Sequence, residues 1–548
     1  ADQLAGYVES EHPEFLVNKL YYDAYKKDMT AGTYPDVRSG LQKLLKDGLL
    51  LFNYTGHGGT TALSDEKVLT QTDINQFTYT HLPVWVTATC DFTRFDDLNT
   101  SAGEDVFLNK SSGGIALFTT VRVAYSRPNF PINDNVIRNL FERNNGRRRT
   151  LGEVMQATKN TLSSVYKLGF CLIGDPAVKM AYPEFGMKVT TVNGQSVDGN
   201  SISFKALEKI TVEGEVLDAS GQLVTDFTGI VNPTVKDSKV TVTCLKNSNK
   251  DDSPAFTFTD YPNTIFIGND SVRNGKFSFT FTVPKDISYS NLQGKMNLYA
   301  VDTKSGNEAQ GNFDNFIVGG TSDTAETDTI GPEIRALYLN DTTFVDGGQV
   351  NTTPYFVAEL WDKSGVNITG SSVGHDMMLV IDESTVLSYN LNSYYELLPG
   401  EEGTGIVKFP IPALEPGKHT AEFWVWDILN NSTVRTFTFE VVEGLKPFLF
   451  DVIATPGIAR EQVTFHLMHN RPESRVRVGI MVYDLAGRQL WKHEESGTSG
   501  LFENYTVSWD LTSGGARMRP GVYIYRAAIS TDNSKDATKA RKFIILGE

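Results

Sequence analysis

The chain has 548 residues, of which 40% are apolar and 11% aromatic, and its formal net charge is −16. At about 100–200 residues per domain, this length predicts three or four domains, and the apolar content excludes a wholly disordered chain. An acidic balance without a basic run argues against nucleic acid or an anionic lipid surface as a partner. No stretch approaches about 18 uninterrupted apolar residues, so no membrane-spanning helix is expected. Three cysteines cannot build a disulfide scaffold.

Residues 1–182 alternate short apolar runs with segments of helical length. Leu49–Tyr54, Leu82–Thr89 and Gly114–Thr120 are the apolar runs, and such runs are typical of parallel strands buried on both faces. One further candidate strand, Leu16–Tyr25, precedes them. Helices are expected at Leu41–Gly48, Ser101–Asn109, Pro131–Asn145 and Thr150–Leu168. The pattern predicts an α/β domain.

From Lys188 onward the pattern changes to period-two alternation, for example at Ile210–Val216 and Phe277–Val283. Half-buried antiparallel strands have this pattern. We therefore expect three β-sandwich (Ig-like) domains after the α/β domain. Their predicted limits are 183–320, 321–444, with 321–332 as a polar linker, and 445–548.

The strongest chemical signal is a histidine between glycines, Gly56-His57-Gly58-Gly59, directly after an apolar strand. Cys90 follows the next strand, 33 positions later. Because parallel strands deliver their carboxyl ends to one edge of a sheet, His57 and Cys90 are expected to lie together. There Cys90 would be the nucleophile and His57 the general base and acid. The backbone N–H groups of Gly58 and Cys90 are the candidate oxyanion hole.

Other reactive side chains carry weaker signals. Cys171 and Cys244 lie in apolar or alternating segments and are expected to be structural. The loop after Cys90 holds Asp91, Asp96 and Asp97, which would attract a basic substrate or form a solvated loop; we favour the solvated loop. His81, His375 and His419 have no partner pattern and are expected to be solvated or capping. No cofactor and no metal site are expected, because the Asp and Asn clusters lack calcium-loop spacing.

The His57 strand end, the Cys90 strand end, the strand GGIALFTT and the closing Ile173–Pro176 together resemble the gingipain family of cysteine peptidases. The resemblance implies a caspase-like α/β sandwich, with His57 as base and Cys90 as nucleophile. That fold has more strands before the His-bearing one, so residues 1–182 are expected to be the C-terminal portion of the catalytic domain. A third catalytic carboxylate would then lie on the absent N-terminal part, which another chain could supply. The secreted gingipains cut after Arg or Lys, but no equivalent pocket can be placed here.

The tail carries a second resemblance. Val482-Tyr483-Asp484, Ser508-Trp509-Asp510 and Arg519–Tyr525 are similar to the C-terminal sorting domain of type IX secretion cargo in Bacteroidota. Within Gly521–Tyr525 we expect Val522 and Ile524 to be buried on one face, with Tyr523 and Tyr525 stacked on the other. An ordinary Ig-like domain without a targeting role is the alternative.

In combination, these regions resemble the cell-surface sortases of the type IX secretion system. The resemblance implies cleavage of the sorting domain from secreted cargo and transfer through a thioester on Cys90 to a lipopolysaccharide-linked amine acceptor. It also implies an outer-membrane barrel partner, PorV, and a location on the extracellular side of the outer membrane of a Gram-negative bacterium. The residues themselves support only acyl transfer by a thiol. A secreted gingipain-like endopeptidase and a catalytically inert surface binding module remain the alternatives.

Overall fold

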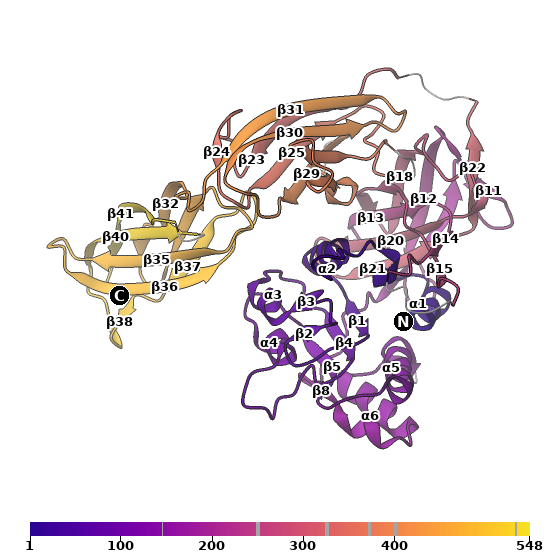
Figure 1. Cartoon of the computed structure of the whole chain (residues 1–548), viewed down its shortest axis with the longest axis horizontal. Coiled ribbons are helices and arrows are strands. Elements are labelled where there is room, and N and C mark those ends of the chain that lie inside the picture. The colour runs from indigo at the N-terminus through magenta and orange to yellow at the C-terminus, as the bar shows by residue number, and fades with distance from the viewer. Residues whose placement is uncertain are drawn as a thin grey trace.

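A computed structural model describes residues 1–144, 146–247, 253–323, 328–370, 374–398, 403–531 and 534–547. Figure 1 shows an N-terminal α/β region below an arc of three β-sheet regions, here called the first, second and third β-modules in chain order. None of the described helices combines the length and apolar character needed to cross a membrane.

The α/β region is built on a four-stranded sheet in the order β1-β4-β5-β8. Its strands are β1 (Leu51–Thr55), β4 (Val84–Ala88), β5 (Ala116–Thr120) and β8 (Phe170–Ile173). β1, β4 and β5 are parallel, and β8 closes the sheet antiparallel to β5. Every residue of β4 and β5 is buried, as expected for parallel strands covered on both faces.

Helices cover both faces of this sheet. Helices α1, α5 and α6 pack against Val86 and Phe118 on one face, and α2, α3 and α4 pack against Trp85 and Leu117 on the other (Figure 1). The alternation of side chains along β4 and β5 supplies the two cores. The helices are α1 (Asp2–Glu11), α2 (Pro35–Asp47), α3 (Gln71–Gln76), α4 (Ala102–Leu108), α5 (Ser126–Phe141) and α6 (Leu151–Thr161). The short elements are 3-10 turns η1 (Tyr22–Ala24) and η2 (Val165–Gly169) and hairpins β2 (Ala62–Leu63) with β3 (Leu69–Thr70) and β6 (Arg143–Asn144) with β7 (Arg147–Arg148).

The predicted strand Leu16–Tyr25 is wrong. Only the turn η1 is regular there, because the segment is held between α1 and the first β-module. Lys19 Nζ donates to Glu9 (3.1 Å) and to the Thr259 carbonyl (2.8 Å). The Asp23 carboxylate accepts the backbone N–H of Asn247 (2.8 Å). These hydrogen bonds hold residues 16–25 in place without strand pairing.

Several predicted helix limits also shift. The helix expected from Leu41 begins at Pro35, a residue suited to the first helical position, and it stops as predicted at Gly48, whose φ is +102°. The helix expected at Pro131–Asn145 spans Ser126–Phe141, and Asn145 lies outside the described residues. The last predicted helix divides into α6 and the 3-10 turn η2.

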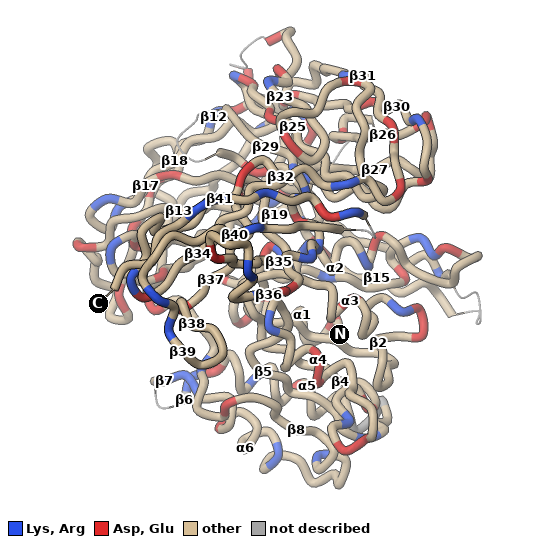
Figure 2. The backbone as a smooth tube through the Cα atoms, turned by 90° about the vertical axis from the view of Figure 1, so that its left-hand side faces the viewer, with Lys and Arg blue, Asp and Glu red and all other residues tan. Residues whose placement is uncertain are grey.

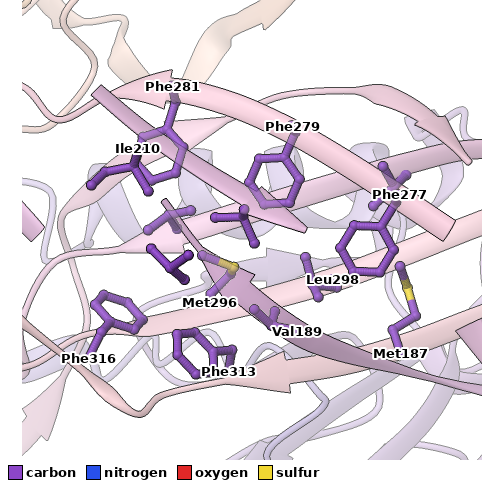
Figure 3. Close-up of a cluster of buried hydrophobic side chains, with 14 of the residues drawn as sticks. Met187, Val189, Ile210, Phe277, Phe279, Phe281, Met296, Leu298, Phe313 and Phe316 are labelled. Carbon is purple, nitrogen blue, oxygen red and sulfur yellow. The ribbon is translucent and has the colours of Figure 1, made fainter. Parts of the chain in front are cut away.

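The first β-module has one large sheet, in the order β10-β9-β12-β18-β17-β13-β20-β21 with β16 paired to β13, and smaller sheets β11-β22-β19 and β14-β15. Phe277, Phe279 and Phe281 of β18 point into a core that also holds Met296 and Leu298 (Figure 3). The strands are β9 (Phe185–Val192), β10 (Gln195–Ser196), β11 (Ile202–Ala206), β12 (Lys209–Leu217), β13 (Gly229–Lys236), β14 (Val240–Thr243), β15 (Thr257–Asp260), β16 (Thr264–Ile267), β17 (Asp270–Arg273), β18 (Lys276–Thr282), β19 (Leu292–Gln293), β20 (Lys295–Asp302), β21 (Glu308–Phe313) and β22 (Phe316–Thr321).

The second and third β-modules each have two main sheets around one buried cluster. The sheets are β23-β25-β29-β28 with β24-β31-β30-β26-β27, and β32-β34-β37 with β33-β41-β40-β35-β36. The strands of the second module are β23 (Glu333–Leu339), β24 (Gln349–Val350), β25 (Tyr355–Trp361), β26 (Met378–Ile381), β27 (Ser388–Asn390), β28 (Tyr395–Leu397), β29 (Thr404–Pro410), β30 (Gly417–Trp426) and β31 (Ser432–Val441), with a 3-10 turn at Asn392–Tyr394. Those of the third are β32 (Leu449–Thr455), β33 (Ile458–Ala459), β34 (Val463–His469), β35 (Val476–Tyr483), β36 (Gln489–Gly497), β37 (Tyr505–Trp509), β38 (Thr512–Ser513), β39 (Ala516–Arg517), β40 (Gly521–Ser530) and β41 (Ala537–Ile545). The Ig-like assignment and the domain limits at 182, 320 and 444 stay predictions, and part of the expected linker 321–332 lies outside the described residues.

The predicted facing of β40 is wrong. Val522 is 40% exposed and Ile524 is half-buried, whereas Tyr523 and Tyr525 lie in the core. Both tyrosine hydroxyls find backbone acceptors there: Tyr523 donates to Arg519 O (2.7 Å) and Tyr525 to Val452 O (3.1 Å). Because the hydroxyls are satisfied, the two rings can be buried.

Charged residues of both signs are interspersed along the backbone in Figure 2 rather than gathered in a basic stripe.

Candidate active site

His57 follows β1 in a turn whose backbone is held from two sides. The Tyr54 hydroxyl donates to the His57 carbonyl (2.6 Å), and the Ser64 N–H donates to the same oxygen (2.8 Å). Burial raises the pKa of Tyr54, so this phenol remains a neutral donor. The His57 side chain itself is exposed. The turn thus fixes the backbone and leaves the imidazole open to a ligand.

Cys90 lies level with His57 in the sheet. β1 and β4 pair in parallel with Tyr54 opposite Thr87 and Thr55 opposite Ala88. Continuing this pairing by two residues beyond each strand places His57 opposite Cys90. The 33-residue spacing between His57 and Cys90 therefore equals the offset between paired residues of β1 and β4.

The turn after β1 comes very close to the end of β4. A Cβ atom on Gly58 would lie 2.5 Å from Thr89 Oγ1. Only glycine allows this approach. A Cβ atom on Gly59, by contrast, would have no neighbour within 4 Å.

The Cys90 sulfur is in contact with the loop that follows β5. Its Sγ donates to the Ala124 carbonyl (3.1 Å), and the Ala124 N–H lies 3.4 Å from the same sulfur. Beneath the loop, the Thr120 hydroxyl donates to the Thr89 carbonyl (2.6 Å). The residue after the cysteine, Asp91, has a φ of +49°, a backbone conformation that non-glycine residues adopt rarely and often at functional sites.

The two amides expected to form an oxyanion hole are available. Across the part of the chain that the structure describes, neither the Gly58 N–H nor the Cys90 N–H donates a hydrogen bond to the protein. They lie after adjacent strands, on the same edge of the sheet as the thiol. The oxyanion assignment nevertheless stays a proposal.

The acidic loop after Cys90 is tied down by arginine. Arg122 donates to both carboxylate oxygens of Asp96, at 3.0 and 2.6 Å. This contact lowers the pKa of Asp96. Asp97 lies 3.6 Å from Arg94. Two of the three loop carboxylates are thus already paired, which favours the solvated-loop interpretation over recruitment of a basic substrate.

The remaining cysteines lie away from this edge or within a strand. Cys171 is a free, half-buried thiol in β8, opposite Thr119. Cys244 is free and buried in the first β-module, and burial raises the pKa of its thiol. Both placements suit structural roles.

Two histidines differ from prediction. His375 Nδ1 lies 2.7 Å from Asp286 with its ring beside Trp426, and His419 Nδ1 lies 2.6 Å from Asp382. Both are half-buried rather than fully solvated, and each is bound to a carboxylate from another segment. His81 is exposed as expected.

One group of described residues has the composition of a cation site. Carboxylate oxygens of Asp328, Asp362 and Asp427 lie within 4.8 Å of one another in the second β-module. Asp362 and Asp427 directly follow β25 and β30, and Asp328 lies in the segment before β23. None of the three lies at the edge that carries His57 and Cys90. The sequence did not indicate this cluster, because its members are far apart along the chain.

Sequence reasoning also missed Ala124 and Asn129. Ala124 contacts Cys90 through its backbone, so its side chain gives no signal. Asn129 lies in the first turn of α5 and lines a hollow beside Ala124. Only the folded arrangement of β5, α5 and η2 brings it near the thiol.

Comparison with known proteins finds a family match for the N-terminal third of the chain. Residues 1–181 match the model of peptidase family C25. No curated protein matches the chain. Among solved structures, PorU from Porphyromonas gingivalis is 36% identical, with 80% of this chain and 41% of that chain covered and a TM-score of 0.33. The Arg-specific cysteine proteinase gingipain R is 19% identical, with 51% and 56% covered and a TM-score of 0.25.

The chain therefore spans less than half the length of PorU. The family match covers the sheet, the His57 turn and Cys90 together. The gingipain-like resemblance predicted from the His57 and Cys90 strand ends is confirmed by the match of residues 1–181 to peptidase family C25.

Proposed function

We propose that this chain is the C-terminal portion of a cell-surface cysteine sortase, a transpeptidase that removes the C-terminal sorting domain from type IX secretion cargo. The observation that carries the proposal is the shared level of His57 and Cys90 on adjacent parallel strands, within a region that matches peptidase family C25.

The proposed chemistry needs only these groups. The Cys90 thiolate attacks the carbonyl carbon of the scissile peptide bond, and the Gly58 and Cys90 amides bind the resulting oxyanion. His57 protonates the leaving amine as the C–N bond breaks, which leaves a thioester on Cys90. An acceptor amine then attacks the thioester, His57 takes its proton, and the Cys90 thiolate leaves as the new amide forms. Water in place of the amine gives hydrolysis with the same pair.

The acceptor and the partners belong to the same proposal. We assign the acceptor amine to a lipopolysaccharide-linked group, and we expect the third β-module to be held by the outer-membrane barrel PorV on the extracellular side. The support is the motif set of β35, β37 and β40, which resembles the sorting domains of type IX cargo. The remainder of the caspase-like sheet would come from an N-terminal part outside this chain.

The test is the mass of a secreted cargo protein in cells whose full-length enzyme carries Cys90→Ala. We expect cargo to accumulate with its sorting domain attached. Cys171→Ala removes the other thiol of the same sheet and should leave trimming intact. Unchanged trimming and anchoring in Cys90→Ala would overturn the sortase proposal.

The two alternatives give different results in a second assay. A gingipain-like endopeptidase would digest generic Arg or Lys peptides with water as the acceptor. An inert binding module would show no Cys90-dependent reaction with a mild electrophile.

A further inference from the structure

We propose that the hollow between the β5–α5 loop and η2 binds a serine or threonine side chain of the substrate, at a residue flanking the scissile bond. The proposal rests on the proposed function, and it adds a substrate class to it. Within this hollow, the acceptor for the substrate hydroxyl is Asn129.

The hollow is adjacent to the nucleophile. Ala124 lines it, and the backbone N–H and carbonyl of Ala124 are the groups in contact with Cys90 Sγ. One residue therefore separates the hollow from the reacting sulfur. A peptide whose carbonyl carbon reaches Cys90 will place a neighbouring side chain within reach of this opening.

The walls of the hollow are fixed by the sheet. The Val121 N–H donates to the Gly169 carbonyl (2.8 Å), and Thr120 pairs with Phe170 where β5 meets β8. These bonds hold η2 beside the β5–α5 loop. Apolar groups from both segments then line the opening, including Val123 and Tyr166. The Tyr166 ring lies edge-on to Tyr125, with ring centroids 5.7 Å apart.

A buried acceptor lies in this lining. Asn129 is only 7% exposed, and within the described residues its Oδ1 atom has no hydrogen-bond partner. A buried polar atom without a hydrogen-bond partner is unfavourable, so a ligand that donates to Oδ1 is favoured. Because the walls are apolar, the donor has to arrive on a short apolar stem.

The volume of the cavity and the charge of its lining favour a hydroxyl as the group that donates to Asn129. The cavity volume is about 10 Å³, which is room for roughly one water-sized group. The lining has no carboxylate, and its only charged residue is Arg122. A lysine or arginine side chain would be too long and would meet a like charge. Serine and threonine are the smallest side chains that carry an O–H on a short apolar stem, so their hydroxyl is the group that we place in the cavity.

The experiment compares peptides that differ only in Ser or Ala at each residue flanking the scissile bond, cleaved by the full-length protein. One hydrogen bond to a buried acceptor predicts a preference of about tenfold for Ser at one of these positions. Asn129→Leu should bring the Ser-to-Ala ratio of kcat/KM close to one. Asn135→Leu, the same change on the same helix but outside the hollow, should keep the wild-type ratio.

Two further measurements make the result decisive. Alkylation of Cys90 by iodoacetamide at the wild-type rate shows that a variant is folded. If Asn129→Leu fails this check, Asn129→Asp retains an acceptor and should still prefer Ser. Equal cleavage of Ser and Ala peptides by the wild type, or an unchanged ratio in folded Asn129→Leu, overturns the subsite while the thiol mechanism stands. Cleavage that persists in Cys90→Ala overturns the proposed function and the subsite together.

Discussion

The parallel sheet of the α/β region and the antiparallel sheets of the β-modules end their strands in different ways. β1 and β4 stop two residues before His57 and Cys90, which leaves an exposed imidazole and a half-buried thiol beyond the last paired residues. In the second β-module, β30 and β31 pair along their whole length, and His419 within β30 is held by Asp382. A histidine is therefore open to a ligand where pairing stops and is tied to the fold where pairing continues.

Substitution of His57 tests the strand end where pairing stops, and we expect it to have the largest effect. His57→Ala should lower the rate of thioester formation by about 10²–10⁴-fold, the range for loss of a general acid–base. His81→Ala removes another exposed histidine and should leave the rate unchanged. Single-turnover kinetics on the full-length protein measure both; equal effects of the two changes would contradict the role of His57.

A smaller effect is expected from the contact between the two strand ends. Gly58→Ala would place a methyl group 2.5 Å from Thr89 Oγ1, so the turn has to move, whereas Gly59→Ala meets nothing within 4 Å. A displacement of about 1 Å at a catalytic group costs on the order of 10²-fold in rate. We expect kcat/KM to fall by that order in Gly58→Ala and to stay near wild type in Gly59→Ala. The reverse order would show that the approach to Thr89 has no part in positioning His57.

In the third β-module, a histidine is expected to control stability rather than catalysis. Burial, followed by the charge of Arg471, lowers the pKa of His469 to about 4. The Arg471 N–H donates to His469 Nδ1 (3.1 Å), a bond that protonation removes. The unfolded state binds a proton near pH 6.5, so stability is complete above that pH and falls by about 3 kcal/mol as the pH drops to 4.

Hydrogen exchange across β34 and β35 measures this loss. His469→Gln should abolish the pH dependence between 6.5 and 4, whereas His466→Gln on the same strand should retain it. If hydrogen exchange in the wild-type module stays unchanged between pH 6.5 and 4, His469 is not held neutral by burial.

The second β-module is expected to show the opposite pH dependence, with a smaller effect. Burial, followed by the charge of Asp427, raises the pKa of Asp362 to about 6. The folded state therefore holds its proton more tightly than the unfolded state, so stability is complete below about pH 4 and falls as the pH rises through 6. Asp362→Asn should slow hydrogen exchange in β25 at pH 7.5 but not at pH 4. Glu333→Gln, a substitution at an exposed position of β23, should leave hydrogen exchange in β25 unchanged at both pH values.

The sequence alone predicted those features that depend on local pattern. The apolar runs of β4 and β5, the stop at Gly48 and the 33-residue spacing of His57 and Cys90 follow from burial and strand direction. Tyr523 and Tyr525 were placed on the wrong face, because alternation shows that a strand has two faces but not which one is buried. Hydroxyl acceptors at Arg519 and Val452 decide that question.

Features that depend on distant segments could not be predicted. Leu16–Tyr25 is apolar enough for a strand, but Thr259 and Asn247 of the first β-module hold it in an irregular path. Ala124 reaches Cys90 through its backbone, and Asn129 lines the same hollow as Tyr166 and Gly169 of η2. No residue pattern near Cys90 carries this information.

The measurement that tests the central claim most directly is intact-mass analysis of the full-length protein after brief reaction with a cargo peptide. The account predicts an added mass equal to the acyl fragment, lost on treatment with hydroxylamine, absent in Cys90→Ala and present in both Cys171→Ala and Cys244→Ala. An adduct that persists in Cys90→Ala, or one that depends on Cys171 or Cys244, would contradict the assignment of Cys90 as the acyl-carrying nucleophile.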